Sequence, residues 1–323
     1  MEHLISKKSI LRCHEMIRPF IHETPVITSS LLNQLTGSKL YFKCENFQKT
    51  GSYKMRGALH AILKLNGEQQ NKGVVTHSSG NFAQALSKAA QTLGIKAYIV
   101  MPSNAPSVKK EGVQTYGGII IESEPTLTSR EEMADKAMEQ YGASFIHPSN
   151  NIEVITGQGT AALELIYAHP HLEYILAPVG GGGLIAGTAV SAHYFGNSCQ
   201  VIGAEPEEAN DAYRSLISGN IESNLTAHTI ADGLRTQLGD QNFPIIKQGV
   251  SQIITVSESA IISAMQLIWE RMKIIVEPSS AVVLAAILKE PSLFKDKETG
   301  IILSGGNVDL NPYFHHLRKT WLK

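Results

Sequence analysis

The sequence is short of cysteine and of net charge, and each shortage excludes a class of protein. Cys13, Cys44 and Cys199 are its three cysteines, and they lie far apart in a chain of 323 residues. They form no CxxC or zinc spacing, so we expect reduced thiols rather than a disulfide framework. The formal net charge is -1. No cluster of lysine and arginine with interleaved aromatic residues occurs, which argues against a nucleic-acid partner.

Long apolar runs are also missing. No run of about 18 uninterrupted apolar residues occurs, so we expect no membrane partner and no membrane span. Residues 1–10 lack the apolar core of a secretory signal, so we interpret the protein as cytoplasmic. The composition is 43% hydrophobic and 18% charged, as in ordinary globular proteins. A chain of this length can bury one large core or two smaller ones.

Helical and strand patterns alternate along most of the chain. Between residues 73 and 147 the predicted strands are 74–76, 97–101, 119–121 and 144–146, separated by predicted helices at 82–93, 108–116 and 130–141. Such alternation indicates parallel strands with helices on the faces of the sheet. The fold class predicted is therefore α/β.

The remainder of the chain alternates as well. Further helices are predicted at 9–21, 31–35, 56–65, 159–168, 184–195, 258–272 and 279–289, and further strands at 40–45, 174–178, 201–204, 253–256 and 301–303. The polar segment 66–73 is interpreted as a boundary. We therefore predict a large domain of residues 1–68 and 149–323 and a small domain of residues 73–148.

One lysine stands where a predicted strand gives way to a predicted helix. Lys54 follows the stretch Gln48-Lys49-Thr50-Gly51-Ser52-Tyr53 and opens the helical pattern. A helix N-terminus disfavours an ammonium, and apolar neighbours such as Met55 lower a lysine pKa by removing water. A neutral amine is what a Schiff base with an aldehyde requires. The alternative is an ordinary surface lysine.

A run of glycines joins a predicted strand to a predicted helix. The run is Gly180, Gly181, Gly182 and Gly183. Backbone N–H groups at such a turn can hold a phosphate, although glycines also permit close packing of a strand on a helix. A dinucleotide site is a further alternative, because Ala186 completes a G-x-G-x-x-[GA] pattern and Glu205 follows the next strand. That would make the protein an NAD-binding one.

Two more polar loops follow predicted strands. They are Ser78-Ser79-Gly80-Asn81 and Ser304-Gly305-Gly306-Asn307. An NAD site leaves both loops and Lys54 without a role. Pyridoxal 5'-phosphate (PLP) needs a lysine, a phosphate cradle, a partner for its ring nitrogen and a donor near its phenolic oxygen, and so it uses all four motifs. The first loop also opens a helix, so its N–H groups suit a substrate carboxylate.

The four motifs, in this order, resemble those of fold-type II PLP-dependent enzymes. The similarity also includes Phe42-Lys43-Cys44-Glu45 and covers nearly the whole chain. Within that group the sequence is most similar to the serine racemases and the short threonine/serine dehydratases. The resemblance implies a two-domain, tryptophan synthase β-like fold with parallel sheets flanked by helices.

The resemblance also implies roles for individual residues. Lys54 would form the Schiff base with PLP, and the four glycines 180–183 would hold the phosphate. Asn81 would bind the phenolic oxygen, and Ser304 would face the ring nitrogen. Ser79 would donate a proton to Cα from the side away from the lysine. The substrate-binding loop would be Ser78, Ser79, Gly80 and Asn81.

The reaction implied is removal of the Cα proton of a small β-hydroxy amino acid. Loss of the hydroxyl then gives a serine/threonine ammonia-lyase, whereas reprotonation gives a serine racemase. Aspartate or threo-3-hydroxyaspartate is the alternative substrate. A ligand-binding homologue without catalytic activity is a further alternative.

A metal site is implied after the strand that ends near residue 204. Glu205 and Asp211 would supply carboxylates and Ala209 a backbone carbonyl to Mg²⁺, or to Ca²⁺ or Mn²⁺. From the residues alone, the favoured interpretation of the segment is an acidic turn in contact with solvent.

The resemblance also implies a homodimer and an ATP site between its subunits. Ser30, Lys49, Thr50 and Tyr116 match positions of that site. Two residues depart from the family pattern. Ser149 replaces an asparagine of the ATP site, which puts the response to ATP in question. Phe82 replaces a histidine found in many relatives after Ser-Gly-Asn, which removes an imidazole beside the cofactor.

Overall fold

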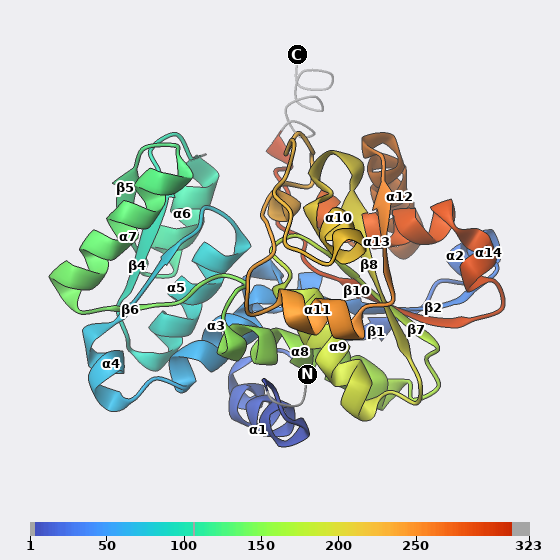
Figure 1. The fold of residues 1–323 in the computed structure, drawn as a ribbon, viewed down its shortest axis with the longest axis horizontal. Helices are drawn as coiled ribbons and strands as arrows, with labels where there is room; N and C mark the ends of the chain where they lie inside the picture. Colours follow the sequence, from blue (N-terminus) through green and yellow to red (C-terminus); the bar gives the residue numbers. More distant parts are fainter. Residues whose placement is uncertain (1–3, 106, 312–323) are drawn as a thin grey trace, which may run out of the picture.

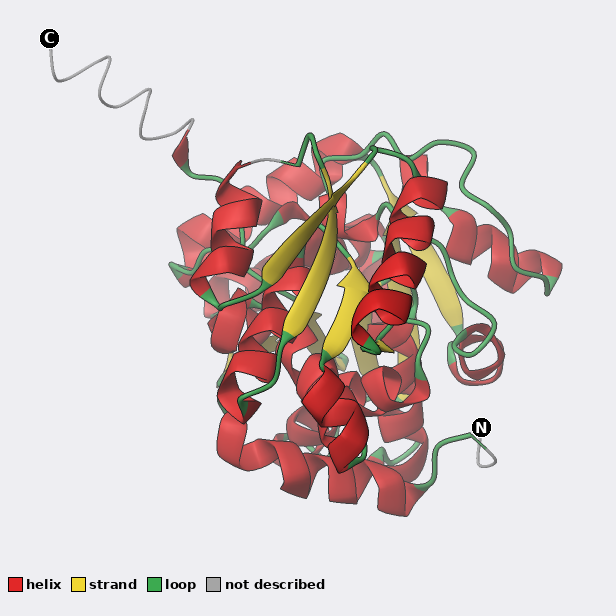
Figure 2. Ribbon diagram, turned by 90° about the vertical axis from the view of Figure 1, so that its left-hand side faces the viewer, coloured by secondary structure: helices red, strands yellow, loops and turns green. Residues whose placement is uncertain are grey.

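The computed structural model describes residues 4–105 and 107–311, which form two sheets flanked by helices (Figures 1 and 2). The strands are β1 Val26–Ile27, β2 Lys39–Cys44, β3 Val74–His77, β4 Ala97–Pro102, β5 Ile119–Ser123, β6 Ser144–Phe145, β7 Tyr174–Pro178, β8 Gln200–Pro206, β9 Gln252–Val256 and β10 Glu298–Leu303. The α/β class predicted from the sequence is confirmed.

The α-helices alternate with these strands. They are α1 Lys7–Ile17, α2 Ser30–Thr36, α3 Lys54–Leu63, α4 Gly67–Lys72, α5 Asn81–Leu93, α6 Ser107–Thr115, α7 Leu127–Tyr141, α8 Ile152–Ala168, α9 Gly183–Phe195, α10 Asp211–Ser218, α11 Phe243–Gly249, α12 Glu258–Met272, α13 Pro278–Lys289 and α14 Pro291–Phe294. Among the residues described, no helix is both long and apolar enough to cross a bilayer.

The strands between residues 74 and 145 form a four-stranded parallel sheet. Its order is β5-β4-β3-β6, so the chain begins in the middle and moves outward in both directions. In β4 all residues but the last are buried, as expected for a parallel strand covered on both faces. The predicted alternation of this segment is confirmed, with α5, α6 and α7 as its crossover helices.

The second sheet has six strands in the order β1-β2-β10-β7-β8-β9. Only the β1–β2 pairing is antiparallel among the pairs described. Strand β10 lies between β2 and β7, so residues 298–303 pair in register with residues 39–44. The sheet therefore pairs β2, from the first part of the described chain, with β10, from its last part.

One prediction of local structure is wrong, and one helix lies in a segment for which no element was predicted. The segment 66–73 contains α4, whose first turn is held by a reciprocal capping box between Asn66 and Gln69. Helix α8 begins at Ile152 instead of Gly159, because Gly157 and Gly159 do not break it. A Cβ at Gly157 would lie 2.5 Å from the carbonyl oxygen of Arg56. Glycine therefore serves the close approach of α3 to α8 within a continuous helix.

Helix α3 packs against α5 on one side and α8 on the other. Figure 1 shows the four-stranded sheet with α4 to α7 on the left, the six-stranded sheet on the right, and α3 and α8 between them. The domain boundaries at 68/73 and 148/149 stay a prediction. Residue 106 of the predicted small domain and residues 312–323 of the large one lie outside the described residues.

Candidate active site

Lys54 is the first residue of α3, and its amine is enclosed by aromatic rings. Its Nζ lies 5.0 Å from the ring centroid of Tyr53 and 5.8 Å from that of Phe82, and it donates to the carbonyl oxygen of Pro148 at 3.1 Å. Burial lowers the pKa of Lys54 to about 8, against the opposing effect of the Glu277 carboxyl. A substantial fraction of the amine is therefore neutral near physiological pH.

The turn that carries Lys54 pairs with the Ser304 loop through backbone hydrogen bonds. The N–H of Tyr53 donates to the carbonyl oxygen of Ser304 at 3.0 Å, and that of Gly306 donates to Gly51 at 2.9 Å. The Ser304 hydroxyl is buried, 3.0 Å from that of Ser280. The structure thus brings together two predicted motifs that are far apart in the sequence.

Asn81 lies in a network centred on a buried carboxyl group. Its Nδ2 donates to both oxygens of Glu277, at 2.8 and 3.1 Å, and its Oδ1 accepts from Nδ2 of Asn307 at 2.9 Å. The backbone N–H of Asn307 also donates to Glu277, at 3.2 Å. Burial raises the pKa of Glu277 to about 7, although the Asn81 hydrogen bonds act in the opposite direction. Glu277 therefore changes charge near neutral pH.

Sequence analysis missed Glu277. It immediately precedes Pro278, the first residue of α13, and nothing in its neighbourhood connects it to Lys54 along the chain. The one signal was an acidic residue between Val276 and a proline, in an otherwise apolar context. Such a residue at a helix start is usually explained by the helix dipole alone.

The glycine run forms the turn into α9. Gly182 has φ of +80°, which a residue with a side chain rarely adopts. A Cβ at Gly181 would collide with Ser149, and one at Gly183 with Gln158. Close packing thus accounts for part of the glycine content. The run also places the N-terminus of α9, a helix of 13 residues, at the end of β7, where its N–H groups suit a phosphate.

A shared carbonyl connects this turn to Lys54. The carbonyl oxygen of Pro148 accepts from Nζ of Lys54 at 3.1 Å and from Nε2 of Gln158 at 3.3 Å. Gln158 in turn borders Gly183. These residues fit PLP: a desolvated amine, a turn without side chains at a helix N-terminus, and a buried hydroxyl at Ser304.

The Ser78-to-Asn81 loop follows β3 and opens α5. Ser78 is tied to β4 by its N–H, which donates to Val100 at 3.1 Å, and its hydroxyl accepts from the N–H of Gly80 at 3.4 Å. Asn81 begins α5, and Ser79 is half-buried beside it. The next residue, Phe82, covers the Lys54 amine, so the loop adjoins the lysine.

Glu205 and Asp211 are fully buried and interact with one another. Glu205 accepts from the backbone N–H groups of Ala212 at 3.2 Å and Tyr213 at 2.9 Å. Burial, with the Asp211 charge, raises its pKa well above the usual range. A carboxylate held in this way is not free to bind a ribose, which argues against the dinucleotide site. Ala209 is buried in the short turn between the two acids.

The two carboxylate oxygens of Asp211 differ in their hydrogen bonding. Its Oδ2 accepts from the N–H of Leu238 at 3.2 Å, whereas its Oδ1 is buried and has no partner among the described residues. Burial raises the pKa of Asp211 to about 6. Within the described ranges no three His, Cys, Asp or Glu side chains are placed to hold a metal. A cation here would therefore need backbone carbonyls and water besides the two carboxylates, an oxygen-rich set that suits Mg²⁺ or Ca²⁺.

The predicted ATP residues do not come together within one chain. Lys49 and Thr50 lie in the turn before Lys54, whereas Ser30 begins α2 and Tyr116 follows α6. Figure 1 shows α2 and α6 at opposite sides of the molecule. A site that uses all four would have to form between two chains.

Comparison with known proteins supports the same cofactor. Residues 17–305 match the family of pyridoxal-phosphate dependent enzymes. The chain is 50% identical to a serine racemase of Dictyostelium discoideum over 313 residues, which cover 95% of this chain and 96% of that protein. It is 48% identical to a β-hydroxyaspartate dehydratase of Paracoccus denitrificans over 304 residues, covering 94% and 96%.

A solved structure shows the same architecture. The structure of maize serine racemase superposes with a TM-score of 0.96 at 43% identity, covering 98% of both chains. The fold-type II class predicted from the motifs is thereby confirmed. The chain belongs to the family of pyridoxal-phosphate dependent enzymes.

Proposed function

We propose that this enzyme acts on small β-hydroxy amino acids as both an ammonia-lyase and a racemase. It would convert L-serine to pyruvate and ammonia, or L-threonine to 2-oxobutanoate and ammonia, and interconvert the enantiomers of serine. The observation that carries the proposal is the Lys54 amine, desolvated between two aromatic rings and adjoining the Ser304 and Asn81 networks.

Four groups would hold PLP, as the resemblance to the family implies. Lys54 would bind its aldehyde carbon, the N-terminus of α9 its phosphate, Ser304 its ring nitrogen and Asn81 its phenolic oxygen. When bound, PLP supplies a conjugated ring that stabilises negative charge on Cα of the amino acid. A serine hydroxyl is a neutral partner for the ring nitrogen, so that stabilisation is weaker than with a carboxylate partner.

Proton transfers would be divided between two side chains. Lys54 would take the Cα proton, because its lowered pKa leaves a substantial fraction of the amine neutral and able to act as a base. Ser79 returns a proton from the other face and gives the opposite enantiomer. The N-terminus of α5, after Ser78-Ser79-Gly80, holds the substrate carboxylate. Glu277 fixes the orientation of Asn81, because its two carboxylate oxygens accept the hydrogen bonds that Nδ2 of Asn81 donates.

A second candidate substrate is a β-hydroxylated aspartate. The supporting observation is the 48% identity to the Paracoccus dehydratase, which is almost as high as the identity to a serine racemase. Racemisation or elimination on aspartate or threo-3-hydroxyaspartate would use the same lysine and serine. The choice between substrates depends on groups that face the side-chain carboxylate.

The test is a product assay on the purified protein with PLP and Mg²⁺. L-serine, L-threonine, L-aspartate and threo-3-hydroxyaspartate are supplied separately, and 2-oxo acids and D-amino acids are measured in each reaction. We expect pyruvate and D-serine from L-serine. Oxaloacetate from hydroxyaspartate, with no product from serine, would transfer the assignment to the second candidate. No turnover of any of the four would contradict the proposal.

We also propose that Glu205, Asp211 and the carbonyl of Ala209 hold a Mg²⁺ or Ca²⁺ ion. The two carboxyls are buried and have raised pKa values, and one has an oxygen without a hydrogen-bond partner; a divalent cation would neutralise their charge. Loss of thermal stability in a chelator, restored by Mg²⁺, Ca²⁺ or Mn²⁺, is the expected result.

The remaining proposals concern assembly and location. The enzyme would be a cytoplasmic homodimer, with the domain boundaries predicted above. ATP would bind at the dimer interface, to Ser30, Lys49, Thr50 and Tyr116. Because α2 and α6 lie far apart in one chain, this site would combine residues of both subunits. Light scattering, with and without ATP, measures both the dimer and its response.

A further inference from the structure

A buried ionic cluster lies beside the turn that carries Lys54. At its centre is Arg56, which has no exposed side-chain surface and uses all five of its N–H donors. Nε and Nη2 donate to Glu45 at 2.7 and 2.8 Å, Nη1 and Nη2 to Glu164 at 2.7 and 2.8 Å, and Nη1 to Thr160 at 3.2 Å. The two carboxylates therefore bind two edges of the guanidinium and fix the orientation of its plane.

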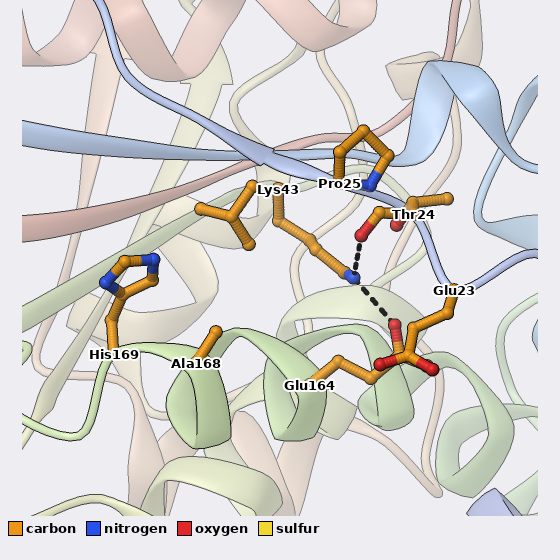
Figure 3. A pocket seen from close by; sticks show the side chains of 8 residues that line it. Glu23, Thr24, Pro25, Lys43, Glu164, Ala168 and His169 are labelled. Atoms are coloured by element: carbon orange, nitrogen blue, oxygen red, sulfur yellow. Dashed lines mark hydrogen bonds and ion pairs between the residues drawn. The ribbon is translucent and has the colours of Figure 1, made fainter.

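The side chain of Lys43 provides a second positive charge next to Glu164. Lys43 donates to Glu164 and to the carbonyl oxygen of Thr24, both at 2.6 Å, and His14 lies 3.1 Å from the other Glu164 oxygen. Figure 3 shows the Lys43 side chain reaching from β2 to Glu164 on α8, at the edge of a cavity of about 450 Å³. We call Arg56, Glu45, Glu164 and Lys43 the Arg56 cluster; it links β2, α3 and α8.

Members of the Arg56 cluster lie on both sides of Lys54 in the sequence, and the cluster lies next to the Lys54 turn in space. Glu45 follows the last residue of β2, Arg56 lies in the first turn of α3, and Lys54 lies between them. Helix α3 is pressed against α8 at Gly157, and the carbonyl that accepts from Lys54 belongs to Pro148, shortly before α8. A shift of α3 relative to α8 would therefore move the amine away from its acceptor.

Stability alone is a poor explanation for such a cluster. Desolvation of buried charges offsets most of their attraction, and apolar side chains of similar volume often stabilise a core equally well. A planar guanidinium with five bonds to two carboxylates and a hydroxyl fixes distances and angles, which apolar contacts do not. The benefit of the cluster is accordingly geometric.

We propose that the Arg56 cluster positions Lys54, holding its amine in the dry site between Tyr53, Phe82 and the Pro148 carbonyl. The proposal deepens the function proposed above and rests on Lys54 as the cofactor lysine. The titratable groups that face Lys54 are Glu277 and His147. Neither belongs to the cluster, so a loosened cluster would act on Lys54 through hydration.

The test measures the proton affinity of Lys54 without using turnover. Full-length protein is freed of PLP with hydroxylamine, and amines are labelled with trace acetic anhydride from pH 6 to 11, followed by peptide mass spectrometry. For Glu164→Gln we expect water to enter and the pKa of Lys54 to rise. A rise of about one pKa unit lowers labelling of Lys54 at pH 8 about fivefold.

Two further variants separate positioning from simple destabilisation. Ile287→Val weakens a hydrophobic cluster that contains no residue of α3 and in which Ile287 is fully buried, and it should leave Lys54 labelling unchanged. The double variant Lys43→Met/Glu164→Gln removes one charge of each sign and serves if Glu164→Gln alone does not fold. It should reproduce the lowered labelling.

Unchanged Lys54 labelling in a folded cluster variant would overturn the proposal, even if its Tm falls. Failure of the proposed function would be recognised separately. Borohydride reduction of the wild-type protein with PLP would then modify a lysine other than Lys54, or none, whereas the labelling still reports the effect of the cluster.

Discussion

Replacing Lys54 by methionine should make the PLP-free protein more stable while abolishing its activity. The pKa of Lys54 falls from 10.5 to about 8 on folding, chiefly through burial. At 1.36 kcal/mol per pKa unit, folding with a charged Lys54 costs about 3 kcal/mol at pH 7. Loss of the hydrogen bond to Pro148 removes about 1 kcal/mol, which leaves a gain of about 2 kcal/mol.

The pH dependence of this gain has a definite sign. Between pH 8 and 10.5 the unfolded chain keeps a proton that the folded chain has lost, so the stability of the wild type rises with pH. Methionine has no such proton. The advantage of Lys54→Met is therefore greatest below pH 8 and disappears toward pH 10.5.

The assay is thermal and urea unfolding of both proteins, without PLP, at pH 7 and pH 10. At pH 7 the variant should melt roughly 4 °C above the wild type. Lys64→Met, at the exposed end of α3, is the matched control and should give no pH-dependent difference. A destabilised Lys54→Met protein, or a gain that is the same at both pH values, would refute the assignment of a buried, largely desolvated amine.

Four other variants have expected outcomes. Lys54→Ala should abolish elimination and racemisation, whereas Ser79→Ala should reduce D-serine formation more than pyruvate formation from L-serine, measured in the same reaction. In Glu277→Gln the fall in stability between pH 4.5 and 7 should flatten in a plot of Tm against pH, because the folded wild type keeps a proton there that the unfolded chain loses. Asp211→Asn should remove the rise in Tm that millimolar Mg²⁺ or Ca²⁺ gives the wild type; an equal rise in both would contradict the metal site.

Local patterns predicted the elements but not the contacts between distant ones. The alternation of apolar strands and amphipathic helices was sufficient for the small sheet, whose strands follow one another along the chain. The Lys54, Asn81, glycine and Ser304 motifs were recognisable because each combines a strand end with turn residues.

Glu277 and Arg56 were not predicted, since their partners come from distant segments. Arg56 looks like a helix-surface arginine until α8 is placed against α3. Glu277 looks like an ordinary helix-start acid until the Asn81 loop closes on it. Helix α8 was predicted to begin at Gly159, whereas it begins at Ile152 and runs through Gly157, where it lies in close contact with α3. Each error concerns packing between elements, about which local propensity says nothing.

The place of β10 has a consequence for how the protein is made. The strands of the small sheet are contiguous in the chain, so they can assemble as soon as residue 145 has left the ribosome. The large sheet cannot close until residues 298–303 emerge and insert between β2 and β7. During synthesis β2 would therefore wait with an unpaired edge until β10 has been made, exposed to wrong partners. The same event docks the Ser304 loop on the Lys54 turn, so Lys54 reaches its final environment only after residues 304–306 have been made.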